Sequence, residues 1–188
     1  MILGVPKETL TNETRVAVIP ATVKQLTSAG FDIIIESNAG KLSQISDADY
    51  IESGAKIVNS ASDIFQKSDM ILKVNSPSEV ELSMLKENSA YISFFQTMKE
   101  TSKVKLFKDK KITGFSMHLI PRTTLAQKMD ALSSQTNIAG YKAVLIGSCH
   151  IDKYMPLLMT AAGTISPAKV LVLGAGVAGL SEIATAKR

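Results

Sequence analysis

Short apolar segments alternate with amphipathic ones along the chain up to residue 115. Segments rich in isoleucine, valine and leucine are typical of strands buried on both faces, and apolar positions that recur every three or four residues are typical of helices. The pattern predicts strands at 2–5, 31–36, 70–74, 90–95 and 112–115. It predicts helices at 20–30, 47–54, 62–67, 80–85 and 102–107. Alternation at this spacing indicates a parallel sheet with helices on both faces.

The pattern that follows residue 115 predicts one long helix. Residues 118–130 are irregular and polar, whereas 132–151 carries apolar side chains at helical spacing. We interpret this helix as the connector between two domains. Cys149 falls on its apolar pattern, which favours an inert buried thiol. A loop bracketed by two prolines, 156–167, follows the helix.

The C-terminal stretch combines a predicted strand, a glycine-rich turn and a helix. Residues Lys169–Leu173 are typical of a buried parallel strand, and residues 177–187 are typical of a helix. Gly174, Gly176 and Gly179 form a Gly-x-Gly-x-x-Gly pattern that begins directly after the strand and ends inside the helix. The first glycine of this pattern allows a tight turn, the second lets the backbone approach a pyrophosphate, and the third lets the helix pack close to the strand. Free N–H groups at the start of the helix then face the phosphates. The alternative is a tight turn without a ligand.

These segments predict an α/β chain with two domains. Residues 1–130 are expected to form a flavodoxin-like parallel-sheet domain, 131–152 the connecting helix, and 165–188 the start of a Rossmann domain. The acidic residue that binds the ribose hydroxyls in a Rossmann domain is expected about 20 residues after the glycines, and the printed sequence ends at Arg188. We therefore expect the first βα unit of a truncated Rossmann domain, and weak dinucleotide binding by this chain alone.

Composition and charge exclude several classes of protein. The chain has 188 residues, of which 45% are hydrophobic and 20% charged, as expected for a globular domain plus a remainder. The net charge of +4 comes from scattered lysines and only 5% of residues are aromatic, so nucleic acid is not an expected partner. A single cysteine suits a reducing compartment. No segment reaches the ~18–20 apolar residues of a membrane span, and we expect a cytoplasmic protein.

Two basic residues, Arg15 and Lys73, are candidates for binding an anion. Lys73 falls near the end of a predicted buried strand, and ligands of open α/β sheets bind beyond the carboxyl ends of the strands. A buried lysine needs an anionic partner to keep its charge. The alternatives are a surface ion pair of Arg15 with Glu8 or Glu13, and a Lys73 side chain that reaches solvent from the end of its strand.

A second group of polar side chains lies on the segment 121–134, where a loop enters the long helix. The segment contains a guanidinium, an amide, a carboxylate and hydroxyl groups, which can hydrogen-bond a ribose, a carboxamide or phosphate oxygens. The alternative is that Asp130 simply caps the helix and Ser133 completes its first turn. The two histidines, His118 and His150, are far apart and have no other ligands at suitable spacing, so no metal site is predicted.

Several long motifs resemble one family of nicotinamide-dependent enzymes. The opening, Gly4-Val5-Pro6-Lys7-Glu8 followed by Asn12-Glu13-Thr14-Arg15-Val16-Ala17, resembles that of alanine dehydrogenase and of the alpha subunit of proton-translocating NAD(P) transhydrogenase. The stretch from Ala126 to Tyr141, AQKMDALSSQTNIAGY, is more similar to the transhydrogenase. So is Met159–Ile165, MTAAGTI, which leads into Pro167–Gly174, PAKVLVLG.

The resemblance implies an NAD(H)-binding domain that exchanges hydride with NADP(H) bound on another domain. In the family this transfer is coupled to proton movement through a membrane domain. Partners are therefore expected to include the NADP-binding and membrane domains or subunits, with a homodimer in the complete protein. The expected location is the cytoplasm, or the cytoplasmic face of the inner membrane through those partners.

The resemblance also implies roles for individual residues. The loop contacting the nicotinamide and its ribose would contain Arg122, Gln127, Asp130 and Ser133, with Gln127 and Asp130 as the catalytic residues. The turn that binds the pyrophosphate would contain Gly174, Gly176, Val177 and Gly179.

Some positions depart from the family pattern. Alanine dehydrogenases have a histidine where this chain has Gln96, and glutamine cannot act as an acid or base. Arg15 and Lys73 match the substrate-carboxylate positions of alanine dehydrogenase but are also found in transhydrogenases. Leu125 stands where the transhydrogenase loop usually has a second arginine. The alternatives to a transhydrogenase component are an alanine dehydrogenase fragment and a non-catalytic remnant or assembly module.

Overall fold

A computed structural model describes residues 1–187 of the chain. These residues form two compact units that divide after Ile120. The segment 121–130, which we expected in the first domain, belongs to the second unit. It therefore shares a unit with the glycine-rich turn.

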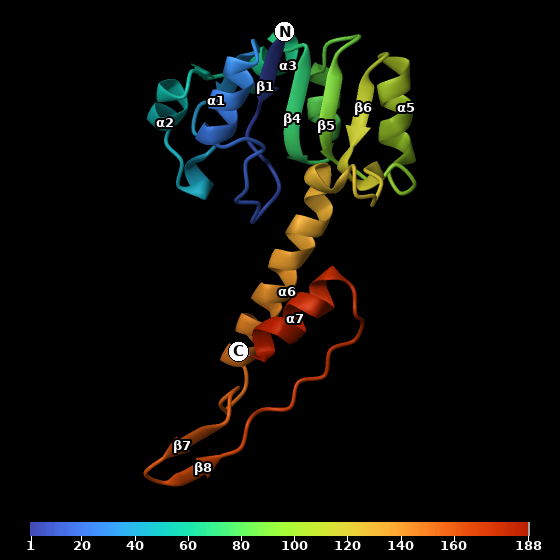
Figure 1. Cartoon of the computed structure of the whole chain (residues 1–188). Helices are drawn as coiled ribbons and strands as arrows, with labels where there is room; N and C mark the ends of the chain where they lie inside the picture. Colours follow the sequence, from blue (N-terminus) through green and yellow to red (C-terminus); the bar gives the residue numbers. More distant parts are fainter. Residues whose placement is uncertain (188) are drawn as a thin grey trace. The chain divides into compact units, whose positions relative to one another are not determined.

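The first unit is built on a six-stranded parallel sheet in the order β3-β2-β1-β4-β5-β6 (Figure 1). The strands are β1 (Ile2–Val5), β2 (Asp32–Glu36), β3 (Lys56–Val58), β4 (Met70–Asn75), β5 (Ala90–Phe94) and β6 (Thr113–Ser116). The five predicted strands are present. The additional strand, β3, is three residues long, too short for a hydrophobic pattern to reveal.

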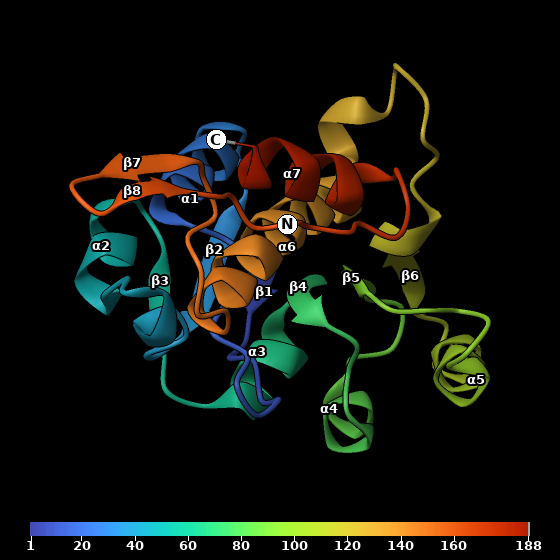
Figure 2. The same cartoon turned by 90° about the horizontal axis from the view of Figure 1, so that it is seen from below.

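Helices cover both faces of this sheet, as predicted. They are α1 (Pro20–Ser28), α2 (Asp47–Glu52), α3 (Ala61–Lys67), α4 (Glu79–Met84) and α5 (Thr101–Asp109). Figure 2 shows α3, α4 and α5 along one side of the sheet. Ile34 of β2 belongs to the apolar core on that side, whereas Ile33 and Ile35 belong to the core shared with α1 and α2. Successive side chains of a strand point to opposite faces, so three consecutive isoleucines are all buried.

The predicted parallel α/β sheet is confirmed. Its strand order is the six-strand order of doubly wound dinucleotide-binding folds, whereas flavodoxin has the five-strand order 2-1-3-4-5. In both, chain direction across the sheet reverses at a switch point, and ligands bind outside the carboxyl ends of the strands there. The switch point of this sheet lies between β1 and β4.

Local interactions fix the ends of several helices. Pro20 occupies the start of α1. An N–H group at this position would have no partner within the helix, so its absence in proline breaks no hydrogen bond. Ser78 caps α4, with Glu81 completing a capping box. At the other end of α4, the Nζ atom of Lys110 donates to the carbonyl oxygens of Leu82, Ser83 and Leu85 at 2.7, 2.8 and 3.3 Å. A cation at this position satisfies carbonyl groups that the helix leaves without partners.

The second unit contains two helices and a hairpin. They are α6 (Ala131–Cys149), β7 (Leu158–Thr160), β8 (Gly163–Ile165) and α7 (Val177–Ala186). The two helices lie side by side (Figure 1). Both helices were predicted, whereas the hairpin falls in a segment that we predicted to be a loop.

The predicted buried strand Lys169–Leu173 is wrong. The segment is not assigned to any sheet, and Leu171 and Leu173 are 84% and 90% exposed. A strand requires a hydrogen-bonded neighbour, and none lies beside this segment in the part of the chain that the structure describes. The expected burial of Cys149 is also wrong, because this residue is exposed.

Candidate functional site

The polar residues of the loop before α6 line one cavity. The cavity has a volume of about 330 Å³ and is lined by Arg122, Thr123, Thr124, Gln127, Asp130 and Ser133. A short 3-10 turn, Gln127–Met129, leads directly into α6 and brings the amide and the carboxylate to the same place. The four loop residues singled out from the sequence are therefore brought together, whereas the two threonines were not among them. The only signal for the threonines was their position next to Arg122.

Asp130 has a defined structural role in this loop. Its carboxylate accepts hydrogen bonds from the backbone N–H and the hydroxyl of Ser133, at 2.9 and 2.6 Å, so that it caps α6. The bonds from Ser133 lower the pKa of Asp130, and the positive charge of Arg122 acts in the same direction. Asp130 is thus held as a carboxylate at neutral pH and is suited to accept hydrogen bonds rather than to donate a proton.

The glycine-rich turn shows a different feature at each glycine. Gly174 has a φ of +110°, which side-chain-bearing residues rarely adopt. A methyl group built on Gly176 meets nothing within 4 Å, whereas one built on Gly179 lies 2.1 Å from the carbonyl oxygen of Gly174. The first glycine is therefore needed for the turn and the third for close packing of α7. The second leaves an open approach to the backbone, as a pyrophosphate site requires.

The N-terminus of α7 has the properties of an anion site. The helix begins at Val177 after the N-cap residue Gly176, which provides no side-chain hydrogen bond. No side chain at the N-cap position therefore accepts a hydrogen bond from the first backbone N–H groups of the helix. Such groups, together with the helix dipole, attract phosphate oxygens.

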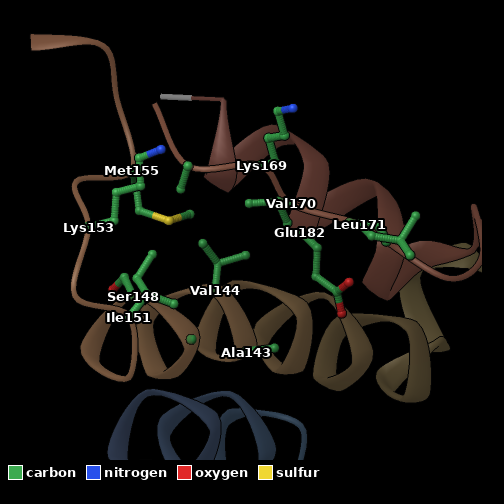
Figure 3. A pocket seen from close by; sticks show the side chains of 13 residues that line it. Ala143, Val144, Ser148, Ile151, Lys153, Met155, Lys169, Val170, Leu171 and Glu182 are labelled. Atoms are coloured by element: carbon green, nitrogen blue, oxygen red, sulfur yellow. The ribbon is translucent and has the colours of Figure 1, made fainter. Parts of the chain in front are cut away.

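A larger apolar cavity of about 510 Å³ lies elsewhere in the second unit. It is bordered by α6, by the segments at residues 151–155 and 168–172, and by Glu182 of α7. In Figure 3, Val144, Met155 and Val170 point into it from three separate segments. Because few polar groups converge on it, this cavity offers little for recognition of a polar cofactor, and the residues predicted to bind one do not line it.

In the first unit, Lys73 lies at the switch point between β1 and β4. Its ammonium is 2.5 Å from Oε1 of Glu81 and 3.7 Å from Oε2 of Glu8, and its side chain is only 1% exposed. The anionic partners of this buried lysine are two carboxylates of the chain itself. The alternative in which the lysine reaches solvent is wrong.

Arg15 is also paired within the chain. Its guanidinium binds both carboxylate oxygens of Glu13, at 2.8 and 2.6 Å, and this is one of the two surface pairs considered from the sequence. The hydrogen bonds from Arg15, with a further one from Asn75, lower the pKa of Glu13 from 4.5 to about 2 although burial raises it. The same pair raises the pKa of Arg15.

Glu8 joins the two parts of this cluster. Its carboxylate accepts the backbone N–H groups of Val74 and Asn75, at 2.6 and 3.2 Å, and the side-chain amide of Asn75 at 3.1 Å. We define the switch-point cluster as Glu8, Glu13, Arg15, Lys73, Asn75 and Glu81. The sequence indicated Glu8 only as a possible surface partner of Arg15 and did not single out Asn75 or Glu81, although Glu8 follows β1 by three residues and parallel neighbours end at the same edge of a sheet.

The switch-point cluster contains three carboxylates and two cations. Both cations are within ion-pair distance of a carboxylate, so a carboxylate substrate would have to displace one. The nearby Gln96 follows β5, and its backbone N–H donates to Glu100 at 2.8 Å. Around Lys73 the cluster is a buried ion-pair network, whereas the pair of Arg15 with Glu13 is partly exposed.

Residues 1–187 offer no candidate for two other kinds of site. No group of three or more histidine, cysteine, aspartate or glutamate side chains in this range is arranged to hold a metal ion. No helix in the same range has both the length and the apolar character needed to cross a bilayer.

Comparisons with known protein families match nearly the whole chain. Residues 4–139 match the model described as alanine dehydrogenase/PNT, N-terminal domain, and residues 143–188 match the model of the C-terminal domain of the same family.

Individual relatives include both enzymes of the family. The chain is 46% identical to NAD(P) transhydrogenase subunit alpha of Haemophilus influenzae over 99% of its own length and 36% of that protein's. It is 41% identical to the same subunit of Cereibacter sphaeroides, again over 99% of the chain and 36% of the relative. Identity to alanine dehydrogenase of Methanococcus maripaludis is 32%, over 95% of the chain and 48% of that enzyme. The chain thus spans less than half of the length of these relatives.

Solved structures agree with these matches. The transhydrogenase of Sinorhizobium meliloti superposes with a TM-score of 0.94 at 42% identity, over 99% of this chain and 53% of that one. An L-alanine dehydrogenase superposes with a TM-score of 0.87 at 26% identity, over 99% and 52%.

Proposed function

The chain belongs to the alanine dehydrogenase/PNT family, and from this premise we propose that it is the NAD(H)-binding part of an NAD(P) transhydrogenase alpha subunit. In this role it exchanges hydride with NADP(H) held on another domain, and the transfer is coupled to proton translocation by a membrane domain. The NADP-binding and membrane domains are the proposed partners. The complete protein is proposed to be a homodimer at the cytoplasmic face of the membrane.

One observation carries this proposal. The polar cavity of the loop before α6 and the glycine-rich turn before α7 lie in the same compact unit. A dinucleotide needs donors and acceptors for its nicotinamide and ribose at one end, and an anion site for its pyrophosphate. The second unit contains both kinds of group.

Different residues of the site are assigned to different parts of the cofactor. We assign Gly174, Gly176, Gly179 and the N–H of Val177 to the pyrophosphate. Around the nicotinamide and its ribose, the amide of Gln127 is suited to the carboxamide, and the carboxylate of Asp130 to hydroxyl groups. Arg122 and Ser133 complete this set, with Arg122 contributing positive charge next to Asp130.

The bound nicotinamide supplies the hydride chemistry, and the protein contributes orientation and exclusion of water. Hydride transfer between two nicotinamides needs no acid or base from the protein. This agrees with Asp130 being held as a carboxylate and with a cavity whose other polar groups are an amide, a guanidinium and hydroxyls. Gln127 and Asp130 therefore act by holding the ring in position.

Isotope transfer tests the proposal. The full-length protein, with its NADP-binding partner present, is given NADPH deuterated at the transferred position together with NAD⁺. Retention of the label in the NADH formed is the expected result, because the hydride passes directly. Loss of the label to solvent, or absence of transfer, contradicts the proposal.

NADH binding by the polypeptide of residues 1–188 provides a second test of the cofactor site. We expect weak NADH binding, because these residues supply the pyrophosphate turn and one polar loop but no assigned acidic partner for the adenosine ribose. Titration calorimetry checks this, and an affinity in the low micromolar range contradicts it.

Alanine dehydrogenase is the second candidate, on the evidence of Arg15 and Lys73 at its substrate positions. The switch-point cluster argues against it, because both cations are paired and Gln96 provides no acid or base. Oxidation of NADH by the full-length protein that depends on pyruvate and ammonia would favour this candidate. A non-catalytic assembly module is the third, and it is favoured if neither activity is present while the protein folds.

A further inference from the structure

The two helices of the second unit approach each other closely at Gly140 of α6. Gly140 is buried, and a methyl group built on it lies 2.3 Å from the carbonyl oxygen of Ala178 and 3.0 Å from two further backbone atoms of that residue. The neighbour is backbone rather than the end of a flexible side chain. Any side chain at position 140 therefore has to displace one helix relative to the other.

Each helix begins at one half of the proposed cofactor site. Asp130 caps α6 at the polar cavity, and Gly140 lies about 15 Å along the helix axis from it. Ala178 is in the first turn of α7, next to Gly179 of the pyrophosphate turn. The contact between Gly140 and Ala178 therefore joins the helix that begins at the cavity to the helix that begins at the turn.

A hydrogen bond supports the same contact. The hydroxyl of Ser181 donates to the carbonyl oxygen of Asn137 at 2.9 Å, one turn from the close approach on both helices. The two interactions hold α7 against α6 through the backbone of Ala178 and the hydroxyl of Ser181.

We propose that Gly140 is a positioning residue, which sets the spacing between the nicotinamide loop and the pyrophosphate turn so that one dinucleotide engages both. This inference rests on the proposed NAD(H) site. Two linked binding events gain a large effective concentration only when the geometry permits both at once. A change in spacing therefore weakens a dinucleotide but leaves each half-ligand unaffected.

The test compares Gly140→Ala with Gly147→Ala in the full-length protein. Both substitutions replace a glycine inside α6, but a methyl group at position 147 meets nothing within 4 Å. Three ligands are titrated: NADH, reduced nicotinamide mononucleotide and ADP. We expect Gly140→Ala to weaken NADH binding at least about tenfold, with the two half-ligands unchanged. We expect Gly147→Ala to leave the affinities for all three ligands unchanged.

Other results overturn the inference. NADH affinity equal to that of the unaltered protein shows that the spacing is not set at Gly140, and equal loss of all three ligands shows general damage to the unit. If Gly140→Ala does not fold, Ser181→Ala decides: selective loss of NADH affinity supports the inference and no loss overturns it. If the unaltered protein does not bind NADH, the proposed function itself is contradicted.

Discussion

The ammonium of Lys73 lies 2.5 Å from the carboxylate of Glu81, and both side chains are buried. The second carboxylate near this ammonium, Glu8, ties the loop after β1 to the end of β4 through backbone N–H groups. One cation thus compensates two acidic groups at the centre of the sheet. The hydrogen bond from the N–H of Val74 to Glu8 connects segments 66 residues apart in sequence.

Replacing Lys73 with methionine should strongly destabilise the protein. The substitution leaves Glu8 and Glu81 buried without their cation, and breaking a buried pair by removing one partner costs about 3–5 kcal/mol. Lys67→Met is the matched control, because its pair with Asp63 is exposed and contributes about 0.5 kcal/mol or less. Urea unfolding of both variants measures the two free energies. Equal values would show that the buried ion pair has no special role.

Glu13 should make stability depend on pH in the acid range. Its pKa in the folded protein is about 2, below the ordinary 4.5, chiefly through Arg15. A lowered carboxyl pKa stabilises the fold above the ordinary value, and this contribution is lost as pH falls from 4.5 toward 2. We expect Glu13→Gln to lower the thermal midpoint at pH 6 and to differ progressively less from the unaltered protein below pH 4.5. A difference that is constant with pH would contradict the assignment.

Asp130→Asn should separate capping from cofactor binding. Asparagine also caps helices, so α6 should keep its stability. The loss of charge weakens hydrogen bonds accepted from ribose hydroxyls, and we expect NADH affinity to fall about tenfold, equivalent to about 1.4 kcal/mol. Lys128→Ala changes a charge on the same loop outside the lining of the cavity and serves as control. Unchanged NADH affinity in Asp130→Asn would remove Asp130 from the site.

Gly176→Ala should impair cofactor binding without affecting stability. The position has a negative φ and open space around it, so the change in unfolding free energy should stay within about 0.5 kcal/mol. The added methyl group occupies the approach that a pyrophosphate needs, and NADH binding should be lost. Gly174→Ala, by contrast, should also destabilise the unit by more than about 1 kcal/mol, because its φ is +110°. Thermal unfolding and NADH titration of both variants provide the comparison. Full NADH affinity in Gly176→Ala would place the pyrophosphate elsewhere.

The sequence predicted the α-helices of the first unit and all of its strands except β3, because these elements have local causes. Three isoleucines in β2 are buried on both faces, and Pro20 marks the start of α1. Prediction failed where the structure of a segment depends on its pairing with another segment. The segment 169–173 has the composition of a strand but no neighbour among the described residues, and the hairpin of β7 and β8 depends on pairing within a segment without strong turn signals.

The candidate sites show the same division. The loop residues from Arg122 to Ser133 are close in sequence, so their common cavity could be anticipated. The partners of Lys73 could not, because Glu8 reaches it only through the pairing of β1 with β4. Gly140 gave no signal at all, since its importance comes from the backbone of a helix almost forty residues away.

The position of β1 between β2 and β4 has a consequence for synthesis of the chain. β1 precedes the other strands of this sheet in the sequence but becomes an interior strand, and its second neighbour does not leave the ribosome until Met70 and the residues after it have been made. Until then one edge of β1 is open to incorrect pairing, and long-range pairing of this kind forms slowly. A nascent chain stalled before β4 should therefore be a substrate for chaperones, whereas one that has passed β5 should already resist proteolysis.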